Sequence, residues 1–236
     1  MNQDKRQNYL AAMGIPLWLP KRTQSQKDIM TDTAFKDTTI QPTIATMSWD
    51  MLAIKIPQCQ LCPELVANRS RTVLGVGNHN ARLLLIGEAP GVDEDQQGEP
   101  FVGRAGKLLT SMLNAIGLQR EEVYIANILK CRPPNNRDPS EEEALHCQPW
   151  LLRQIELIAP ELILAVGRIA AHNLLQTKTP IGKLRGQVYQ YGQRHIPLIV
   201  TYHPSYLLRS PSQKVHAWED LQRVITLLNQ NLPVAN

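Results

Sequence analysis

Residues 82–109 read "RLLLIGEAPGVDEDQQGEPFVGRAGKLL" and contain an apolar run, a turn rich in glycine and acidic residues, and the start of an amphipathic run. A buried strand, a loop and a helix in this order form the repeating unit of parallel α/β proteins. Three further short apolar runs occur at 122–128, 161–166 and 196–201. Because these runs are continuous rather than alternating, they are typical of strands in a sheet that is covered on both faces.

Segments with helical periodicity separate the apolar runs. The segment 138–159 has three acidic residues near its start, which favour a helix N-terminus capped by Asp138 or Ser140. We therefore predict an α/β fold, a three-layer α/β/α sandwich with a central four-stranded parallel sheet. The helices are expected at 103–117, 138–159, 167–176 and 212–232.

The bulk composition fits one domain with an extension. The chain has 236 residues, 43% of them apolar, and a formal net charge of +4, which permits nucleic-acid binding without requiring it. Residues 1–50 are predicted to form an N-terminal extension and flexible linker, and residues 51–236 the domain. No run of 18 apolar residues occurs, so we expect no membrane span, and without an apolar leader we expect a cytoplasmic protein.

The extension contains an apolar segment at 8–19, "NYLAAMGIPLWL". Exposure of its apolar side chains, Leu10, Ile15, Leu17 and Trp18, is otherwise unexplained. A frayed terminus is one interpretation, and a peptide that docks in the groove of a partner is the other.

Four cysteines are present, and Cys59 and Cys62 form a C-x2-C pair. Cys131 and Cys147 follow and flank a loop and a predicted helix start. Four buried thiols are one interpretation, because free cysteine often behaves as a small apolar residue. The pairing favours a metal site instead, and four thiolates suit either zinc or an iron–sulfur cluster, between which the spacing does not decide.

Polar loops follow three of the four predicted strands, and ligands bind at the carboxyl ends of strands in such sheets. The first loop, 87–95, matches neither the dinucleotide-binding nor the P-loop pattern. Its proline and glycines suit close approach of a ligand to the backbone. Its carboxylates could position a water molecule or stabilise positive charge, although a solvated acidic turn is the simpler interpretation of each alone. These carboxylates belong to Glu88, Asp93, Glu94 and Asp95.

Single residues near the other loops suggest a planar ligand. Phe101 could stack on a base, and Asn127 has the donor and acceptor that match a pyrimidine edge. His203 could donate to an oxygen that gains charge. Each also has a structural interpretation: a core ring, a turn cap and a loop histidine. Downstream, Ser205 and Arg209 could contact phosphate, and Tyr206, Leu207 and Leu208 could form an apolar wedge that enters a base stack.

Taken together, three stretches closely resemble the motifs of the type 4 uracil-DNA glycosylases: "GEAPGVDEDQQGEPFVGRAGKLL", "NILKCRPPNNRDPS" and "TYHPSYLLR". The resemblance spans about 55–230 and includes all four cysteines. It implies a [4Fe-4S] cluster on Cys59, Cys62, Cys131 and Cys147. It also implies a monomeric enzyme that hydrolyses the N-glycosidic bond of uracil in single- and double-stranded DNA, leaving an abasic site. The alternative is a non-catalytic nucleic-acid-binding member of the same superfamily.

The resemblance also assigns roles to individual residues. Ala89 stands where type 1 enzymes carry an aspartate, so we assign water activation to Glu94, with the neighbouring acids left open. The N-terminal segment faintly resembles the start of the clamp-loader psi subunit, which implies a replication-complex partner. The implied uracil contacts are Gly87, Ala89, Pro90, Gly91, Phe101 and Asn127, the catalytic residues are Glu88, Glu94 and His203, and the expected DNA contacts are Ser205, Leu207 and Arg209.

Overall fold

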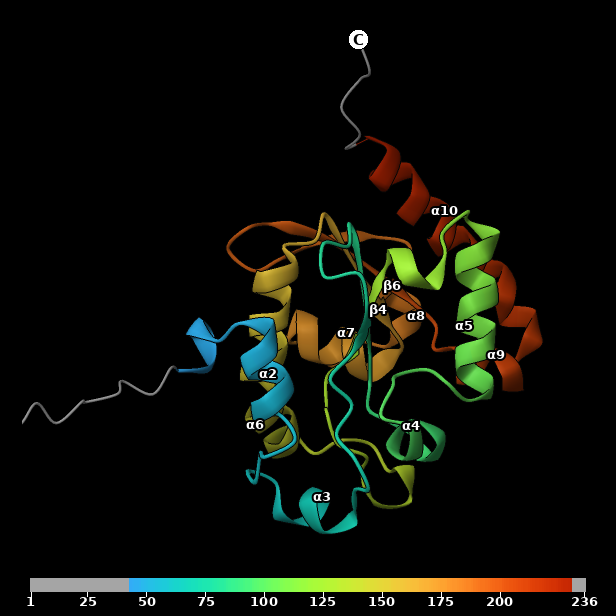
Figure 1. The fold of residues 1–236 in the computed structure, drawn as a ribbon. Helices are drawn as coiled ribbons and strands as arrows, with labels where there is room; N and C mark the ends of the chain where they lie inside the picture. The colour runs from blue at the N-terminus through green and yellow to red at the C-terminus, as the bar shows by residue number, and fades with distance from the viewer. Residues whose placement is uncertain (1–42, 231–236) are drawn as a thin grey trace, which may run out of the picture. The chain divides into compact units, whose positions relative to one another are not determined.

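The computed structural model describes residues 43–230, in which helices cover both faces of one sheet (Figure 1). The helices are α2 (Trp49–Lys55), α3 (Pro63–Asn68), α4 (Val92–Gln97), α5 (Arg104–Ala115), α6 (Glu141–Ile158), α7 (Arg168–Leu175), α8 (Ile181–Leu184), α9 (Pro204–Arg209) and α10 (Lys214–Gln230). The strands are β1 (Val76–Gly77), β2 (Leu83–Gly87), β3 (Tyr124–Asn127), β4 (Leu162–Val166), β5 (Val188–Tyr191) and β6 (Ile196–Thr201).

Within residues 43–230 the sheet has six strands, in the order β1-β3-β2-β4-β6-β5. The four central strands are parallel and coincide with the four apolar runs, as predicted. The predicted count of four strands is wrong, because β1 and β5 add antiparallel edges. A search for apolar runs misses both edge strands, since β1 has two residues and β5 alternates between exposed and half-buried side chains.

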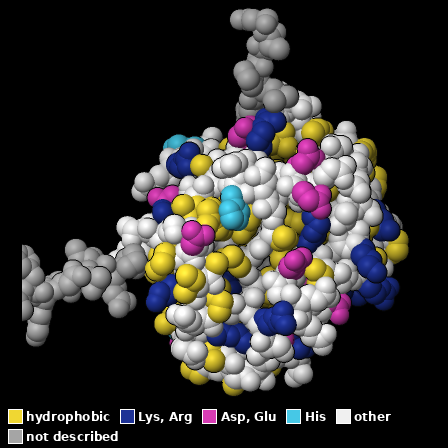
Figure 2. All heavy atoms as spheres, viewed as in Figure 1, with side chains coloured by type: hydrophobic (Ala, Val, Ile, Leu, Met, Phe, Trp, Pro, Cys, Tyr) yellow, Lys and Arg dark blue, Asp and Glu magenta, His cyan; other side chains and the backbone are white. Residues whose placement is uncertain are grey.

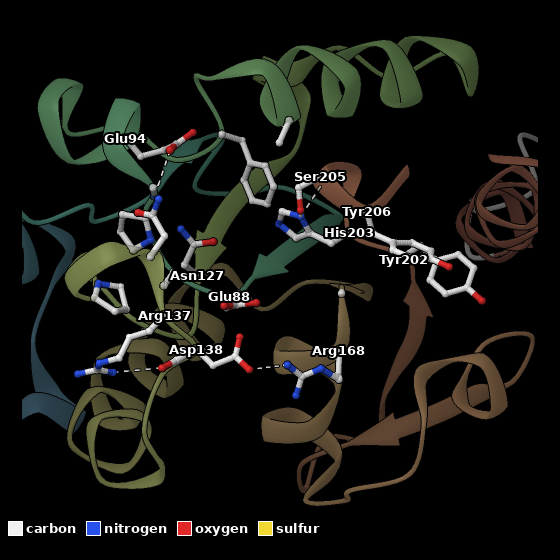
Figure 3. A pocket seen from close by; sticks show the side chains of 18 of the residues that line it. Glu88, Glu94, Asn127, Arg137, Asp138, Arg168, Tyr202, His203, Ser205 and Tyr206 are labelled. Carbon is white, nitrogen blue, oxygen red and sulfur yellow. Dashed lines mark hydrogen bonds and ion pairs between the residues drawn. The ribbon is translucent and has the colours of Figure 1, made fainter. Parts of the chain in front are cut away.

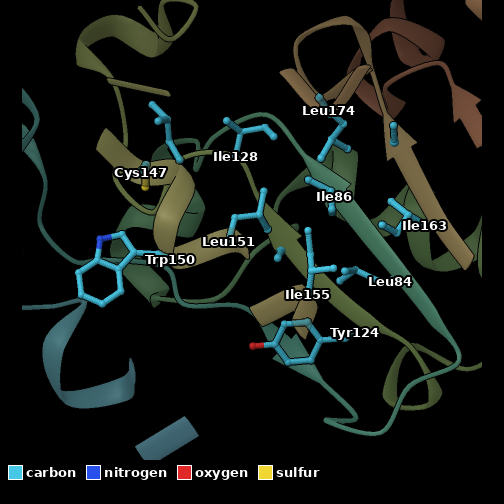
Figure 4. Close-up of a cluster of buried hydrophobic side chains, with 14 of the residues drawn as sticks. Leu84, Ile86, Tyr124, Ile128, Cys147, Trp150, Leu151, Ile155, Ile163 and Leu174 are labelled. Carbon is cyan, nitrogen blue, oxygen red and sulfur yellow. The ribbon is translucent and has the colours of Figure 1, made fainter. Parts of the chain in front are cut away.

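Alternate residues of each central strand supply two separate cores. Leu84 and Ile86 face one side, where they pack with α2, α6 and α7. Figure 4 shows this cluster, in which Leu151 and Ile155 of α6 lie over the strands. Leu83 and Leu85 face the other side, against α5 and α10. The three-layer arrangement therefore follows from strands that are apolar on both faces.

The longest helix, α6, begins as the sequence predicts. The Ser140 hydroxyl accepts a hydrogen bond from the Glu143 backbone N–H at 3.1 Å, and the Glu143 carboxylate accepts one from the Ser140 N–H at 2.8 Å. This reciprocal cap satisfies two of the N–H groups that a helix start leaves without partners. It also fixes the first turns of α6, which carry Cys147.

The acid-rich turn is shorter than the sequence suggested. Residues Val92–Gln97 form α4, with Gly91 as its N-cap and Gly98 as its C-cap. Gly98 has φ +81°, a left-handed conformation that glycine adopts without strain. Because α4 is helical, the neighbouring acids point in different directions.

Packing on the core begins at Ile44, ahead of the residue 51 at which the predicted domain starts. The apolar segment 8–19 lies outside the described residues. None of the described helices has the length and apolar character needed to cross a bilayer. On the face drawn in Figure 2, basic and acidic side chains are interspersed, which agrees with the small net charge.

Candidate active site

A cavity of about 740 Å³ opens at the carboxyl ends of the central strands, where the sequence analysis placed the site. Its wall combines the loops that follow all four parallel strands. Figure 3 shows that Glu88, Asn127 and His203 approach it from three of them. Of the predicted residues, the cavity is lined by Glu88, Ala89, Pro90, Gly91, Glu94, Phe101, Asn127, His203, Ser205 and Arg209.

Asn127, the last residue of β3, is 3% exposed and lines the cavity. Its side-chain oxygen Oδ1 is buried and has no hydrogen-bond partner among residues 43–230. A buried polar atom without a partner costs free energy, so few persist without a reason. The unpartnered Asn127 oxygen is explained if a ligand in the cavity donates a hydrogen bond to it.

Phe101 and Asn127 both line the cavity, and Gly87, which is not itself in the cavity wall, packs closely against the two; we call this part of the site the slot. A Cβ atom on Gly87 would lie 2.4 Å from Asn127 Oδ1 and 2.7 Å from the Phe101 ring, so only glycine fits here. Phe101 has φ 55°, which is uncommon for a residue other than glycine. Helix α5 packs on its backbone: a Cβ on Gly106 would lie 1.8 Å from the Phe101 carbonyl oxygen. The strained phenylalanine is therefore held in place by close packing.

His203 precedes α9, and its ring centroid lies 5.5 Å from that of Phe101. The Ser205 backbone N–H donates to its Nδ1 at 3.2 Å, and the Ser205 hydroxyl oxygen lies 2.7 Å from the same nitrogen. Burial, with a smaller effect of Arg209, lowers the pKa of His203 to about 4. The imidazole is therefore neutral near pH 7. Because Nδ1 accepts a hydrogen bond, the ring proton is on Nε2, which is then a neutral donor.

Glu88 follows β2 directly, and its carboxylate is half-buried in the wall of the cavity. Burial raises the pKa of Glu88 to about 7, with a further increase from Asp138 and an opposing effect of Arg168. A carboxylate with this pKa can take up a proton near neutral pH. Glu88 is therefore suited to handle a water molecule.

Glu94 holds the loop around the slot together. One carboxylate oxygen accepts from the backbone N–H groups of Val102 and Gly103, at 3.0 and 3.1 Å, and the other accepts from Gly91 N–H at 3.1 Å. Both oxygens are thus committed to the backbone. The assignment of water activation to Glu94 is not supported by this geometry, which favours Glu88.

We expect the substitution Glu94→Ala to destabilise the fold. It removes three charge-assisted hydrogen bonds, and each bond to a charged group contributes about 1.5–3 kcal/mol. A drop in Tm of about 10 °C or more, measured by calorimetry, would follow for a domain of this size, in which 1 kcal/mol shifts Tm by about 2–4 °C. The exposed neighbour provides the control, Glu99→Ala. An unchanged Tm for Glu94→Ala would show that the three bonds do not hold the loop.

Leu207 is not available to DNA in this structure, which corrects its predicted role. Its side chain is 0% exposed and belongs to the core between the sheet, α5 and α10. The adjacent Leu208 is 38% exposed. Ser205 and Arg209 do line the cavity, so their predicted positions at the site agree with the structure.

An ion pair at the cavity wall was missed by sequence reasoning. Arg168 Nη2 and Asp138 Oδ2 lie 2.5 Å apart. Both side chains line the cavity close to Glu88 (Figure 3). The segment after β4 is otherwise apolar, so its composition does not indicate a site residue. Only the position of Arg168 just after the end of a parallel strand could have indicated one.

The four cysteines line one cavity on the other side of the loop that follows β3. Arg69 Nη1 donates to Cys131 Sγ at 3.0 Å, and the Lys130 backbone N–H donates to Cys147 Sγ at 3.3 Å. Burial raises the pKa of the Cys147 thiol to about 12. Within residues 43–230, no three His, Cys, Asp or Glu side chains are arranged to hold a single metal ion.

The fold and the cavity define a class of protein. Residues 74–222 match the family model of the uracil DNA glycosylase superfamily. Three relatives are each described as a type-4 uracil-DNA glycosylase. The protein of Archaeoglobus fulgidus is 44% identical over 192 residues, which cover 79% of this chain and 96% of the relative. That of Saccharolobus solfataricus is 45% identical over 182 residues (74% and 84%), and that of Thermotoga maritima 42% over 186 (77% and 95%). The chain belongs to the type-4 uracil-DNA glycosylases.

Proposed function

We propose that the protein excises uracil from DNA by hydrolysing the bond between the base and deoxyribose, which leaves an abasic site. The observation that carries the proposal is the unpartnered oxygen of Asn127 in the slot beside Phe101 and Gly87. The membership of the chain in the type-4 family supports the same reaction. A non-catalytic DNA-binding function has no support from these relatives.

The slot is suited to uracil rather than to cytosine. Uracil has an N–H donor at N3 and a carbonyl acceptor at O4, which match the Oδ1 and Nδ2 atoms of Asn127 in turn. Cytosine has the opposite arrangement at these two positions and would leave both pairs unmatched. Such mismatched buried polar groups give large discrimination.

The base must leave the helix before it can enter the cavity. Flipping costs a few kcal/mol of lost stacking and pairing. Phe101 then provides a ring on which the base can stack, and Arg209 provides a cation for the adjacent phosphate.

Bond cleavage requires stabilisation of charge on both sides of the bond. As the bond from C1′ to N1 breaks, its electron pair passes to uracil, and His203 Nε2–H donates to the developing charge on O2. Water attacks C1′, which carries positive charge, and its proton passes to the Glu88 carboxylate. Ionised Glu88 also stabilises the positive sugar.

The pH dependence of the excision rate should follow the ionisation of the Glu88 carboxyl group. Because only the ionised carboxylate accepts a proton, the single-turnover rate should rise with pH and level off above about pH 7. The substitution Glu88→Gln should lower the plateau rate about 10²-fold or more and remove the step near pH 7. The exposed Glu121→Gln is the control. A step that persists in Glu88→Gln would assign it to another group.

The substitution Glu88→Gln, which should lower the rate, should raise the stability of the folded protein. The pKa of Glu88 is raised in the folded protein, so the folded state loses stability as pH rises from the unfolded value of the carboxyl group through about 7. Glu88→Gln should therefore raise Tm at alkaline pH more than at acidic pH.

For the cysteine site we propose a [4Fe-4S] cluster. A zinc ion needs its four thiolates within about 2.3 Å of one point, whereas each thiolate of a cluster binds a different iron. Four cysteines around one cavity that do not converge on a point fit the cluster better. The Arg69 guanidinium and the Lys130 backbone N–H, which donate to Cys131 Sγ and Cys147 Sγ, would stabilise thiolates that bind the cluster. When bound, the cluster would connect the segments that carry its ligands.

Metal analysis of the purified protein tests the cofactor. We expect visible absorbance together with iron and acid-labile sulfide in equal amounts. Cys131→Ser should reduce all three and lower Tm, because one ligand of the cluster is lost. Zinc without sulfide would contradict the cluster.

The activity itself is tested with an oligonucleotide that carries one uracil. After incubation with the protein, alkali should cut the strand at that position, and a matched strand with cytosine should stay intact. Failure to cut the uracil strand with an intact cluster would contradict the proposed function.

A further inference from the structure

Lys130 lies at the junction of the two sites. It is 1% exposed, although its side chain carries an ammonium group. A buried charge is costly unless it is paired and hydrogen-bonded. Lys130 is adjacent to Cys131 in sequence and lines the cysteine cavity. Lys130 has no part in the reaction proposed above, so its burial must have another cause.

The ammonium group contacts the residue that faces the substrate cavity. Lys130 Nζ donates to the backbone oxygen of Asn127 at 3.0 Å. In the described part of the chain this oxygen is its one hydrogen-bond acceptor. Asn127 is the last residue of β3, so Lys130 satisfies a carbonyl at the point where the strand ends. The backbone that carries the uracil-reading amide is thereby fixed from behind.

The segment between Asn127 and Cys131 forms hydrogen bonds both to the substrate cavity and to the cysteine cavity. On the substrate side, Ile128 N–H donates to Gly87 O at 3.0 Å, and Leu129 N–H donates to Glu88 O at 3.1 Å. On the cysteine side, Lys130 N–H donates to Cys147 Sγ. A shift of either wall would therefore be transmitted to the other through a few bonds.

Charge explains why a lysine can occupy this position. Thiolates that bind iron are negative, and Cys147 and Cys131 lie close enough to Lys130 for their negative charge to favour its charged form. The ammonium thus interacts both with this negative charge and with the Asn127 carbonyl oxygen. An apolar residue of the same length would fill the space but would provide neither interaction.

We propose that Lys130 is a positioning residue that joins the cysteine site to the uracil-reading amide by holding the backbone of Asn127 in place. The proposal rests on the function and the cofactor proposed above. It implies that binding of the base depends on Lys130, whereas binding of the DNA backbone does not.

The test compares two ligands on the full-length, iron-containing protein. Lys130→Met keeps the length of the side chain and removes the charge. We expect its affinity for free uracil, measured by calorimetric titration, to fall about tenfold or more, because small displacements of positioned groups have large effects. Affinity for DNA with an abasic-site analogue, iron content and visible spectrum should stay unchanged. Lys178→Met, at a side chain 89% exposed, is the control.

The outcomes separate positioning from a purely structural role. Equal losses for both ligands, or unchanged uracil affinity in iron-containing Lys130→Met, would overturn the proposal. If Lys130→Met does not fold, Lys130→Gln takes its place with the same expectations, because it is neutral and its side chain is one bond shorter than that of lysine, which weakens the bond to the Asn127 oxygen. Failure of both neutral variants to fold, while Lys130→Arg folds and binds uracil normally, would make the role structural and overturn the proposal. Wild-type protein without iron or uracil binding would contradict the proposed function before any variant is compared.

Discussion

The substitution Asn127→Asp should lower uracil excision by about 10³-fold or more. A carboxylate can accept from N3–H of uracil but cannot donate to O4, so two oxygens would face each other in the buried slot. The substitution changes little in shape, and Asn127 Oδ1 has no partner to lose among residues 43–230. The new carboxylate is buried and should lower Tm, so the rate is measured at a temperature at which the variant is folded, where its loss reports base recognition.

Single-turnover excision from a single-uracil oligonucleotide measures this effect. Asn114→Asp, on the exposed side of α5, is the matched control and should behave as wild type. A cytosine strand should be cut weakly at most by Asn127→Asp, because its N4 amino group can donate to the new carboxylate. Unchanged uracil excision would show that Asn127 does not read the base.

The substitution His203→Asn should have the second-largest effect. Removal of a donor to a developing oxyanion typically lowers kcat about 10²–10³-fold. Because the donor acts mainly in the transition state, KM should change little. His195→Asn, at an exposed residue with a left-handed backbone that asparagine tolerates, is the control. Equal kcat in His203→Asn and wild type would remove His203 from the reaction.

The protonation state of His203 gives a separate prediction. Its pKa is lowered to about 4, so the ring stays neutral from about pH 5 upwards and causes no step in the rate. In Glu88→Gln, where the carboxyl step is absent, the rate should be flat from about pH 5 to 8. A fall in the rate as pH rises through about 6.5 would indicate that imidazolium is the donor.

The sequence was sufficient for those parts of the fold that depend on apolar runs. The runs at β2, β3, β4 and β6 are buried on both faces, so their composition alone indicates strands. The edge strand β5 has no such signal, because its pairing with β6 rather than its own composition makes it a strand.

The site was predictable in location but not in its division of roles. Four acids lie between residues 88 and 95, and their directions depend on where α4 begins. The structure places Glu94 against backbone N–H groups and Glu88 in the cavity wall, which no local pattern indicates. Similarly, α9 has six residues, too few for its periodicity to show that Leu207 rather than Leu208 faces the core.

The most direct test of the account is the identity and amount of the base released from a single-uracil oligonucleotide by the wild-type protein. Chromatography of the reaction, with alkali cleavage of the same sample, compares free uracil with abasic sites. We predict that one uracil is released for each abasic site formed. Tight binding of the uracil strand without release of free uracil would contradict the account, because the cavity would then bind the base without cleaving its bond.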